Sequence, residues 1–252
     1  EAVLPSHGQE IADLTKMGMW KIISCSSLEP MVKVIPSTWS FQKKRFPDGC
    51  FNKCRVRFCV CGDLMQKDVH FTGSTYSPTV GWPMIHACLM LATSLNLHTR
   101  QIDFQNAFCQ AKQEYPLFIE LPPLYKVSGR EHEDLVLSLQ KSLYGTVTAP
   151  KQFYDHIHAG MISEGFVPSD SDPCLYIHHE HQVMVLQYVD DQIWITKDLK
   201  YITPHTTSLQ RKQFLLTMEE DADLFAFLGI EIKRLPDQVE LNSPKWVRLR
   251  RC

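Results

Sequence analysis

Residues 183–196 read VMVLQYVDDQIWIT and contain the clearest strand pattern in the chain. An apolar run from Val183 to Leu186 precedes the pair Asp190-Asp191, and a second run from Ile193 to Ile195 follows it. Two apolar strands separated by a short polar segment predict a β-hairpin with both carboxylates at its turn. Aspartate is also favoured in turns for backbone reasons alone, so this pair by itself remains compatible with an ordinary turn.

A third carboxylate closes another expected strand. The segment QIDFQNAF, residues 101–108, places Asp103 at the end of an apolar strand expected over 99–104. Mg²⁺ prefers oxygen ligands and is usually held by few carboxylates together with substrate phosphates. Two-metal phosphoryl transfer needs carboxylates that hold ions about 4 Å apart. A strand-end aspartate beside a hairpin with two more would meet that need, whereas three carboxylates without cations would repel one another.

The remaining segments predict an α+β protein. No internal repeat or low-complexity linker divides the chain, so we expect one intertwined unit over 1–252. Pro83 and Pro150 lie where helices are expected to begin, and Gly165 where one is expected to end. The expected helices cover 8–17, 84–97 and 151–164, and the further expected strands cover 38–46, 51–61 and 116–121.

Composition excludes several classes of protein. With 44% hydrophobic residues in 252, the chain has material for a packed core. A formal charge of −2 argues against a histone-like binder that depends on bulk positive charge, but permits a local basic groove. No apolar run reaches the roughly 18 residues that span a bilayer, and the first residues do not resemble a signal peptide. We therefore expect an intracellular protein, cytoplasmic or nuclear and not secreted, with no membrane partner.

Charge is nevertheless uneven. Residues 41–57 contain six basic residues and one acidic residue on an expected hairpin with Pro47-Asp48-Gly49 at its turn. The C-terminal end adds Lys245, Arg248, Arg250 and Arg251, and residues 219–223 form an acidic segment expected at a surface loop or helix end. Basic side chains bind phosphate, but they also occur on solvated strand faces, and the pattern alone leaves both open.

Cysteines and histidines give two weaker metal candidates. The nine cysteines are an odd number, as expected of an intracellular chain without disulfides. Cys50, Cys54, Cys59 and Cys61 form either a zinc site or a set of buried free thiols on a strand, where Cys59 and Cys61 share a face. The zinc alternative would make the chain a zinc-binding module. His178, His179 and His181 lie at the tip of an expected hairpin and are weak metal-ligand candidates.

Several ordered blocks resemble one family. The reverse transcriptase domain of copia-type LTR retrotransposons, part of a Pol polyprotein, is similar to this chain from about Gln9 to about Val247. The blocks are TKMGMWKII, STWSFQKKRFPDG, RVRFCVCGD, TYSPTVGWPMIHACLMLA, QIDFQNAF, KSLYGTVTAPKQFY, DPCLYI, QYVDD and FLGIEIKR. The resemblance implies a right-hand polymerase with fingers at about 30–100 and 120–160, palm at about 101–119 and 161–240, and a thumb that is largely missing. The palm would be an antiparallel sheet flanked by helices.

The resemblance also implies an activity: RNA-directed DNA polymerisation, with nucleotidyl transfer from a dNTP to a primer 3′-hydroxyl. The partners would be an RNA or DNA template, a primer, dNTPs and the rest of a Pol polyprotein. Two Mg²⁺ ions, or Mn²⁺ instead, would be the cofactors. The implied catalytic residues are Asp103, Asp190 and Asp191, with the Phe104 carbonyl as a further metal ligand.

Substrate contacts follow from the same resemblance. Lys53 and Arg57 would hold the incoming triphosphate, and Tyr144-Gly145 would close over the nucleotide and the template base. Phe108 corresponds to the steric gate that crowds a 2′-hydroxyl, although a core role explains this aromatic residue equally well. The segment Phe227-Leu228-Gly229-Ile230 would grip the primer.

The chain departs from the family pattern at several positions. Cys61 stands where an arginine is usual, Val147-Thr148 stands where Lys-Gln is usual, and Gln187 and Gln192 flank the carboxylate turn where apolar residues are commoner. These departures leave two hypotheses open: an active polymerase domain, or a catalytically inactive, truncated remnant that retains the fold and nucleic-acid binding.

Overall fold

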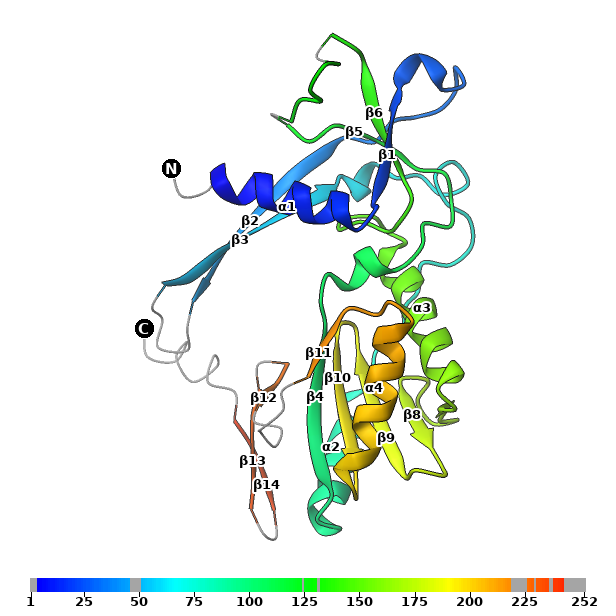
Figure 1. Cartoon of the computed structure of the whole chain (residues 1–252). Coiled ribbons are helices and arrows are strands. Elements are labelled where there is room, and N and C mark those ends of the chain that lie inside the picture. The colour runs from blue at the N-terminus through cyan, green and yellow to red at the C-terminus, as the bar shows by residue number, and fades with distance from the viewer. Residues whose placement is uncertain are drawn as a thin grey trace. The chain divides into compact units, whose positions relative to one another are not determined.

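The computed structural model of the chain describes residues 4–45, 51–123, 125–130, 132–218, 226–228, 230–235 and 238–242 (Figure 1). The chain forms two compact units that alternate along the sequence. Unit 1 consists of Glu1–Ser77 and Phe108–His156, and unit 2 consists of Pro78–Ala107 and Ile157–Cys252. These bounds differ from the expected fingers and palm ranges, because residues 78–100 belong to unit 2 and residues 108–119 to unit 1.

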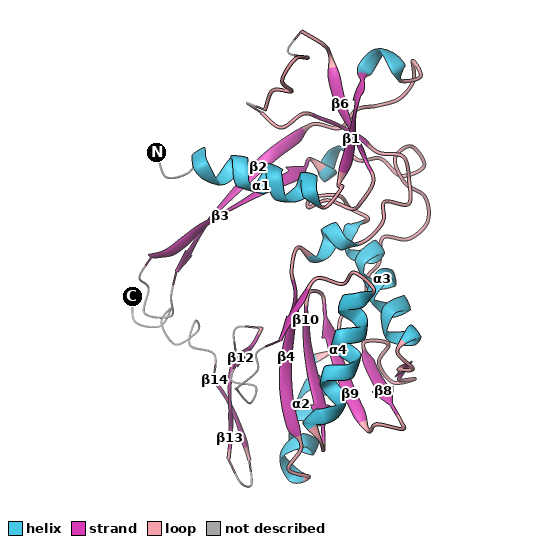
Figure 2. Cartoon of the chain, in the orientation of Figure 1, coloured by secondary structure: helices cyan, strands magenta, loops and turns pink. Residues whose placement is uncertain are grey.

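Unit 1 contains two antiparallel sheets. One has the strand order β1-β6-β5, with Trp20 opposite Leu139, and the other is the long hairpin β2-β3 (Figure 2). Along β3 the side chains of Val56, Phe58 and Val60 are buried, which is the period of a strand with one face on the core. Its described elements are α1 (Leu4–Lys16), β1 (Trp20–Ser24), η1 (Cys25–Ser27), β2 (Ser37–Arg45), β3 (Phe51–Val60), η2 (Gly62–Leu64), η3 (Ala107–Gln110), β5 (Phe118–Glu120), β6 (Leu135–Leu139) and the first half of α3 (Ala149–Ser163).

Unit 2 is built on a six-stranded antiparallel sheet with the order β11-β4-β10-β9-β8-β7. Every residue of β10 after Asp191 is buried, because helices cover both faces: Figure 1 shows α4 crossing the front of the sheet and α2 behind it. Its elements are α2 (Trp82–Ser94), β4 (His98–Phe104), β7 (Val167–Pro168), β8 (Leu175–His178), β9 (Val183–Tyr188), β10 (Asp191–Thr196), η4 (Leu199–Tyr201), α4 (Ile202–Arg211), β11 (Leu216–Met218), β12 (Ala226–Phe227), β13 (Ile230–Arg234) and β14 (Val239–Asn242).

The sheet formed by β12, β13 and β14 includes the expected primer-gripping segment. Phe227 is buried, and Leu228 has a φ of +53°, a left-handed conformation typical of a turn. Gly229 lies outside the described residues, as do the turn at 46–50, the acidic segment at 219–223 and the basic C-terminal end.

The predicted mixture of helices and antiparallel strands is confirmed, with element ends shifted by a few residues. Gly165 has a φ of +86°, as expected where a helix ends in the left-handed region. Cys54, Cys59 and Cys61, on and directly after β3, are free thiols, as one of the two alternatives predicted. The expectation that they are buried is wrong, because the core-facing positions belong to Val56, Phe58 and Val60 and the thiols are only partly buried.

No helix within the described ranges is long and apolar enough to cross a lipid bilayer.

Candidate active site

The carboxylate pair lies at the expected hairpin turn between β9 and β10. Tyr188 is the pairing partner of Asp191, and Val189 between them has a φ of +51°. A β-branched residue rarely adopts this left-handed conformation, so the turn is a strained one. The amide of Phe104 donates a hydrogen bond of 2.8 Å to the carbonyl of Asp190, which ties the turn to the end of β4.

Strand pairing brings the third carboxylate to the same place. Asp103 on β4 stands directly opposite Asp191 on β10, and Thr217 on β11 stands opposite Asp103 on its other side. Gln101, Asp103, Asp191 and Thr217 line one cavity of about 320 Å³. Asp103 is exposed, whereas Asp190 and Asp191 are half-buried. The sheet therefore presents acidic side chains from two adjacent strands to one space.

The ionisation of Asp191 is perturbed. Burial is the main cause that raises its pKa to about 6, and the charges of Asp190 and then Asp103 add to it, against a hydrogen bond of 3.3 Å donated by the Gln101 amide. A bound cation would reduce the repulsion between negative charges that lie this close together. This perturbation thus fits the donor set of a hard divalent metal ion.

Asp191→Asn is expected to stabilise the protein at pH 7 and to have little effect at pH 4. Because the pKa of Asp191 is raised from its usual 3.8 to about 6, the folded state retains the proton over a wider range than the unfolded chain. Its contribution to stability is full below about pH 3.8 and is lost as the pH rises through about 6. We expect a gain of about 1 kcal/mol at pH 7, a figure reduced for solvent screening of this half-buried side chain.

Thermal unfolding of both proteins in EDTA, at pH 4 and at pH 7, measures this difference. An equal shift in melting temperature at the two pH values would contradict the perturbed ionisation.

The metal-binding capacity of the carboxylate site rests on few side chains. Within the described ranges, a close grouping of three metal-ligating side chains occurs only at His178, His181 and His205. The carboxylate site instead offers Asp103 and Asp191 on one cavity and Asp190 on the adjoining turn. This oxygen-only donor set suits Mg²⁺, which retains waters and substrate oxygens in its coordination shell.

The two glutamines that flank the turn are buried and hydrogen-bonded to each other. Gln187 and Gln192 are cross-strand partners, exposed by 3% and 0%. The Trp194 indole N–H donates to Gln192 Oε1 at 2.7 Å, the Gln192 amide donates to Gln187 Oε1, and the Gln187 amide donates to the carbonyl of Val189. We call these three side chains the amide chain. It satisfies polar groups that would be costly if buried alone, and it ends on the strained turn residue.

In unit 1 the expected substrate residues form an aromatic and cationic group. The guanidinium of Arg57 lies 4.7 Å from the ring centroid of Tyr144, a cation–π distance. Its buried Nε has no hydrogen-bond partner within the described residues. Phe108 makes edge contacts with Tyr144 at 5.9 Å and with Phe153 at 6.2 Å and packs against the core cluster, so its core role is real.

Gly145 is required by a close backbone approach. Its φ is +89°, and a Cβ there would lie 2.1 Å from the carbonyl oxygen of Val60. The amide of Val60 donates to the carbonyl of Tyr144 at 2.8 Å, which joins the Tyr144-Gly145 segment to the end of β3. The backbone of Lys53 pairs with Lys44 on β2, but its side chain is outside the described part of the chain.

Sequence reasoning missed two residues of the carboxylate cavity. Gln101 lies two positions before Asp103 and therefore on the same face of β4, a relation that strand periodicity could have identified. Thr217 is more than a hundred positions away and reaches the site only through the pairing of β11 with β4, for which no local pattern exists.

An antiparallel sheet with paired aspartates on a hairpin turn, opposite a strand-end aspartate, has the form of a nucleic-acid polymerase palm. Residues 18–248 match the family model described as reverse transcriptase (RNA-dependent DNA polymerase). The chain belongs to this family.

The similar curated proteins are retrotransposon polyproteins. The Pol polyprotein from transposon TNT 1-94 of Nicotiana tabacum is 31% identical over 244 residues, covering 95% of this chain and 18% of that protein. The one from transposon RE2 of Arabidopsis thaliana is 30% identical over 219 residues, covering 86% and 15%. The truncated transposon Ty1-A Gag-Pol polyprotein of Saccharomyces cerevisiae is 29% identical over 241 residues, covering 92% and 19%. The chain thus spans less than a fifth of these relatives, and its resemblance to copia-type polyproteins is confirmed.

One solved structure resembles the chain in fold. It is the foamy viral protease-reverse transcriptase dRH in complex with ds DNA, with a TM-score of 0.50 and 14% sequence identity, covering 98% of this chain and 36% of that chain. The likeness confirms the α+β, polymerase-like fold.

Proposed function

We propose that this chain is an RNA-directed DNA polymerase domain that works within a retrotransposon Pol polyprotein. The observation that carries the proposal is the pairing of Asp103 with Asp191 across β4 and β10, with Asp190 on the adjoining turn. These carboxylates lie inside the segment that matches the reverse transcriptase family. The partners would be an RNA or DNA template, a primer and dNTPs, in the cytoplasm, in a particle or in the nucleus.

In this proposal the carboxylates hold two Mg²⁺ ions, or Mn²⁺ instead, which would supply charge neutralisation at the reacting phosphate. Asp103 and Asp190 are the principal ligands, with the Phe104 carbonyl as a further one. Asp191 has a supporting role, which fits its raised pKa and its bond to Gln101. The primer 3′-hydroxyl attacks the α-phosphate in line and pyrophosphate leaves, so the protein contributes mainly positioning and electrostatics.

We assign the fingers to unit 1 and the palm to unit 2. Arg57, whose buried Nε has no hydrogen-bond partner among the residues that the structure describes, would bind the triphosphate together with Lys53. Tyr144-Gly145 would close over the nucleotide, and Phe108 would combine packing with exclusion of a 2′-hydroxyl. The segment Phe227-Leu228-Gly229 of the palm unit would contact the primer.

A second candidate function is a catalytically inactive remnant that retains nucleic-acid binding. Cys61 and Val147-Thr148 replace residues that are polar or basic in the family pattern, which would remove phosphate or template contacts. The amide chain argues against loss of an ordered palm site, because its buried polar groups are hydrogen-bonded to one another beside the carboxylate turn.

Primer extension separates the two candidates. The purified chain, given an RNA template, a DNA primer and dNTPs, is expected to extend the primer with Mg²⁺ and to stop when EDTA is added. Binding of the same primer–template is measured in parallel by fluorescence anisotropy. Binding without extension in either Mg²⁺ or Mn²⁺ would refute the polymerase proposal for this chain and support the remnant.

A further inference from the structure

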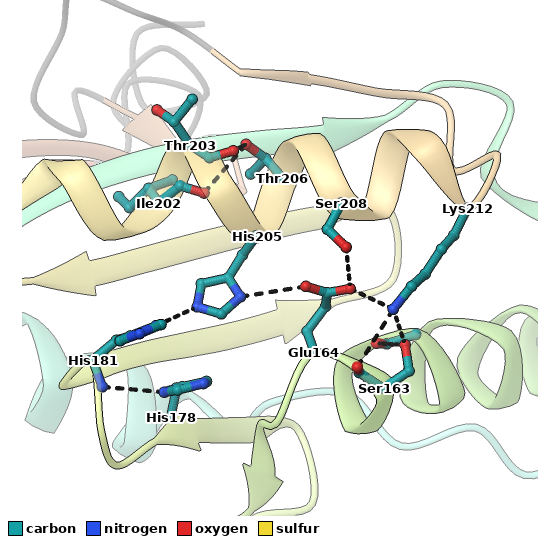
Figure 3. Close-up of polar contacts among 11 residues, drawn as sticks. Ser163, Glu164, His178, His181, Ile202, Thr203, His205, Thr206, Ser208 and Lys212 are labelled. Carbon is teal, nitrogen blue, oxygen red and sulfur yellow. Dashed lines mark hydrogen bonds and ion pairs between the residues drawn. The ribbon is translucent and has the colours of Figure 1, made fainter.

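We propose that His178, His181 and His205 of unit 2 form a zinc-binding site. His178 ends β8, His181 lies in the turn between β8 and β9, and His205 lies on α4. One ring nitrogen from each histidine lies within 4.8 Å of the others (Figure 3). Three imidazoles are a common ligand set for Zn²⁺, which binds ring nitrogens at about 2.0–2.1 Å.

The hydrogen bonds around His205 place a lone pair in the cluster. The carboxylate of Glu164 accepts hydrogen bonds from the Ser208 hydroxyl at 2.7 Å and from the Lys212 ammonium, so its oxygens act as acceptors. His205 Nδ1 therefore donates to Glu164 Oε2 at 3.4 Å, which leaves His205 Nε2 unprotonated. That nitrogen faces His181 Nδ1 at 2.9 Å. A metal ion can replace the hydrogen that lies between two facing imidazole nitrogens.

Zinc requires the rings to turn, because those of His178 and His181 are stacked with centroids 4.3 Å apart and planes 8° apart, whereas an imidazole binds a metal through a lone pair in its ring plane. Two nitrogens on one tetrahedral Zn²⁺ stand about 3.3–3.4 Å apart, so the rings of His181 and His205 would separate by roughly half an ångström. His181 would carry its proton on Nε2 instead of Nδ1. His178 Nδ1 accepts the backbone N–H of His181 at 3.1 Å, and a turn of its ring would exchange this bond for the third metal bond.

The surroundings of the three histidines favour a bound metal ion over protonated, positively charged imidazole rings. His178 and His205 are only 8% and 6% exposed, so an unpaired positive charge on either ring would be costly to bury. Glu164 supports His205 from behind, and it is fixed in turn by Ser208 at 2.7 Å and by Lys212 (Figure 3). A carboxylate that orients a metal-bound imidazole is the usual outer partner of such sites.

This site is separate from the carboxylates of the proposed polymerase. His181 precedes the start of β9, and the carboxylate turn follows its end, a separation of about 16 Å at 3.3 Å per strand residue. Zinc here would join α4 to the β8–β9 turn and thus hold a helix on the sheet. The exposed neighbour His179 lies outside the cluster, so the ligand that completes the site comes from α4 and not from the hairpin.

Zinc titration of the purified chain tests the site without any polymerase readout. The protein is first stripped with EDTA and desalted, then given excess Zn²⁺ and desalted again. It is expected to retain one Zn²⁺ per chain by elemental analysis and to melt at a higher temperature than the stripped protein. His181→Gln and His205→Gln should abolish retention, and Glu164→Gln should weaken binding about 10–100-fold. His179→Gln is the matched control and should bind like the wild type.

If His205→Gln unfolds, His181→Gln still tests the site, because His181 is half-exposed and its replacement should leave the fold intact. Circular dichroism checks that His181→Gln is folded. Mg²⁺ in millimolar excess should not displace the zinc, because Mg²⁺ prefers oxygen ligands. No retained zinc in the wild type would overturn the proposal. Retention that survives His181→Gln but is lost on Cys54→Ser would also overturn it, in favour of the cysteine cluster.

Discussion

Replacing Asp103 with asparagine is expected to lower the rate of primer extension about a thousandfold without unfolding the protein. The substitution removes one charge from the cavity that Asp103 shares with Asp191, and with it about 4 kcal/mol of transition-state stabilisation. The side chain is exposed and β4 pairs through its backbone, so the fold should persist. Asp190→Asn should have an effect of the same size, because both residues are proposed as principal metal ligands.

The matched control is Asp170→Asn, an exposed carboxylate of the same unit that lies outside the cavity. It should extend the primer at the wild-type rate. Single-turnover extension at saturating dNTP separates chemistry from binding, and melting temperatures confirm folding. Extension by Asp103→Asn within about threefold of the wild type would remove Asp103 from the proposed machinery.

Replacing Gly62 with alanine is expected to destabilise unit 1 by about 3 kcal/mol or more. A Cβ at position 62 would lie 1.9 Å from the carbonyl oxygen of Gly145, and the obstacle is backbone that a rotamer change cannot move aside. The clash would push apart the end of β3 and the Tyr144-Gly145 segment, which the Val60 amide joins.

Urea unfolding at pH 7 gives the free energy of unfolding for this comparison. The control is Gly8→Ala in α1, where a Cβ meets nothing within 4 Å and alanine should stabilise the helix by about 0.5–1 kcal/mol. If Gly62→Ala were as stable as Gly8→Ala, the close approach of the two backbones would be refuted.

The hairpin at residues 183–196 was predictable because its information is local. Apolar runs on both sides of Asp190-Asp191 predict two strands and a turn, and hairpin register then makes Gln187 the partner of Gln192. In the sequence these glutamines are recognisable as departures from the family pattern. Only the strand pairing shows that their side-chain amides are hydrogen-bonded to each other. The placement of Asp103 opposite Asp191 depends on which strand neighbours β10, and no periodicity encodes that choice.

The histidine cluster shows the same limit. His178 and His181 were suspected because they are close in sequence, but the third member, His205, belongs to a helix that follows two further strands. The local pattern suggested His179 instead, which points elsewhere because adjacent residues at a strand end do not share a face. The division into two units was also beyond sequence reasoning, since no linker composition marks residues 77, 107 or 156.

The interleaving of the two units affects how the protein can be synthesised. Each unit contains two separate stretches of chain, so neither is complete when its first stretch leaves the ribosome. Trp20 on β1 must wait for its partner Leu139 on β6, about 120 residues later, which at 5–20 residues per second takes roughly 6–24 seconds. During that time the apolar edge of β1 has no strand beside it. A fragment that ends before residue 135 lacks β6, the central strand with which both β1 and β5 pair, and therefore cannot form the first sheet.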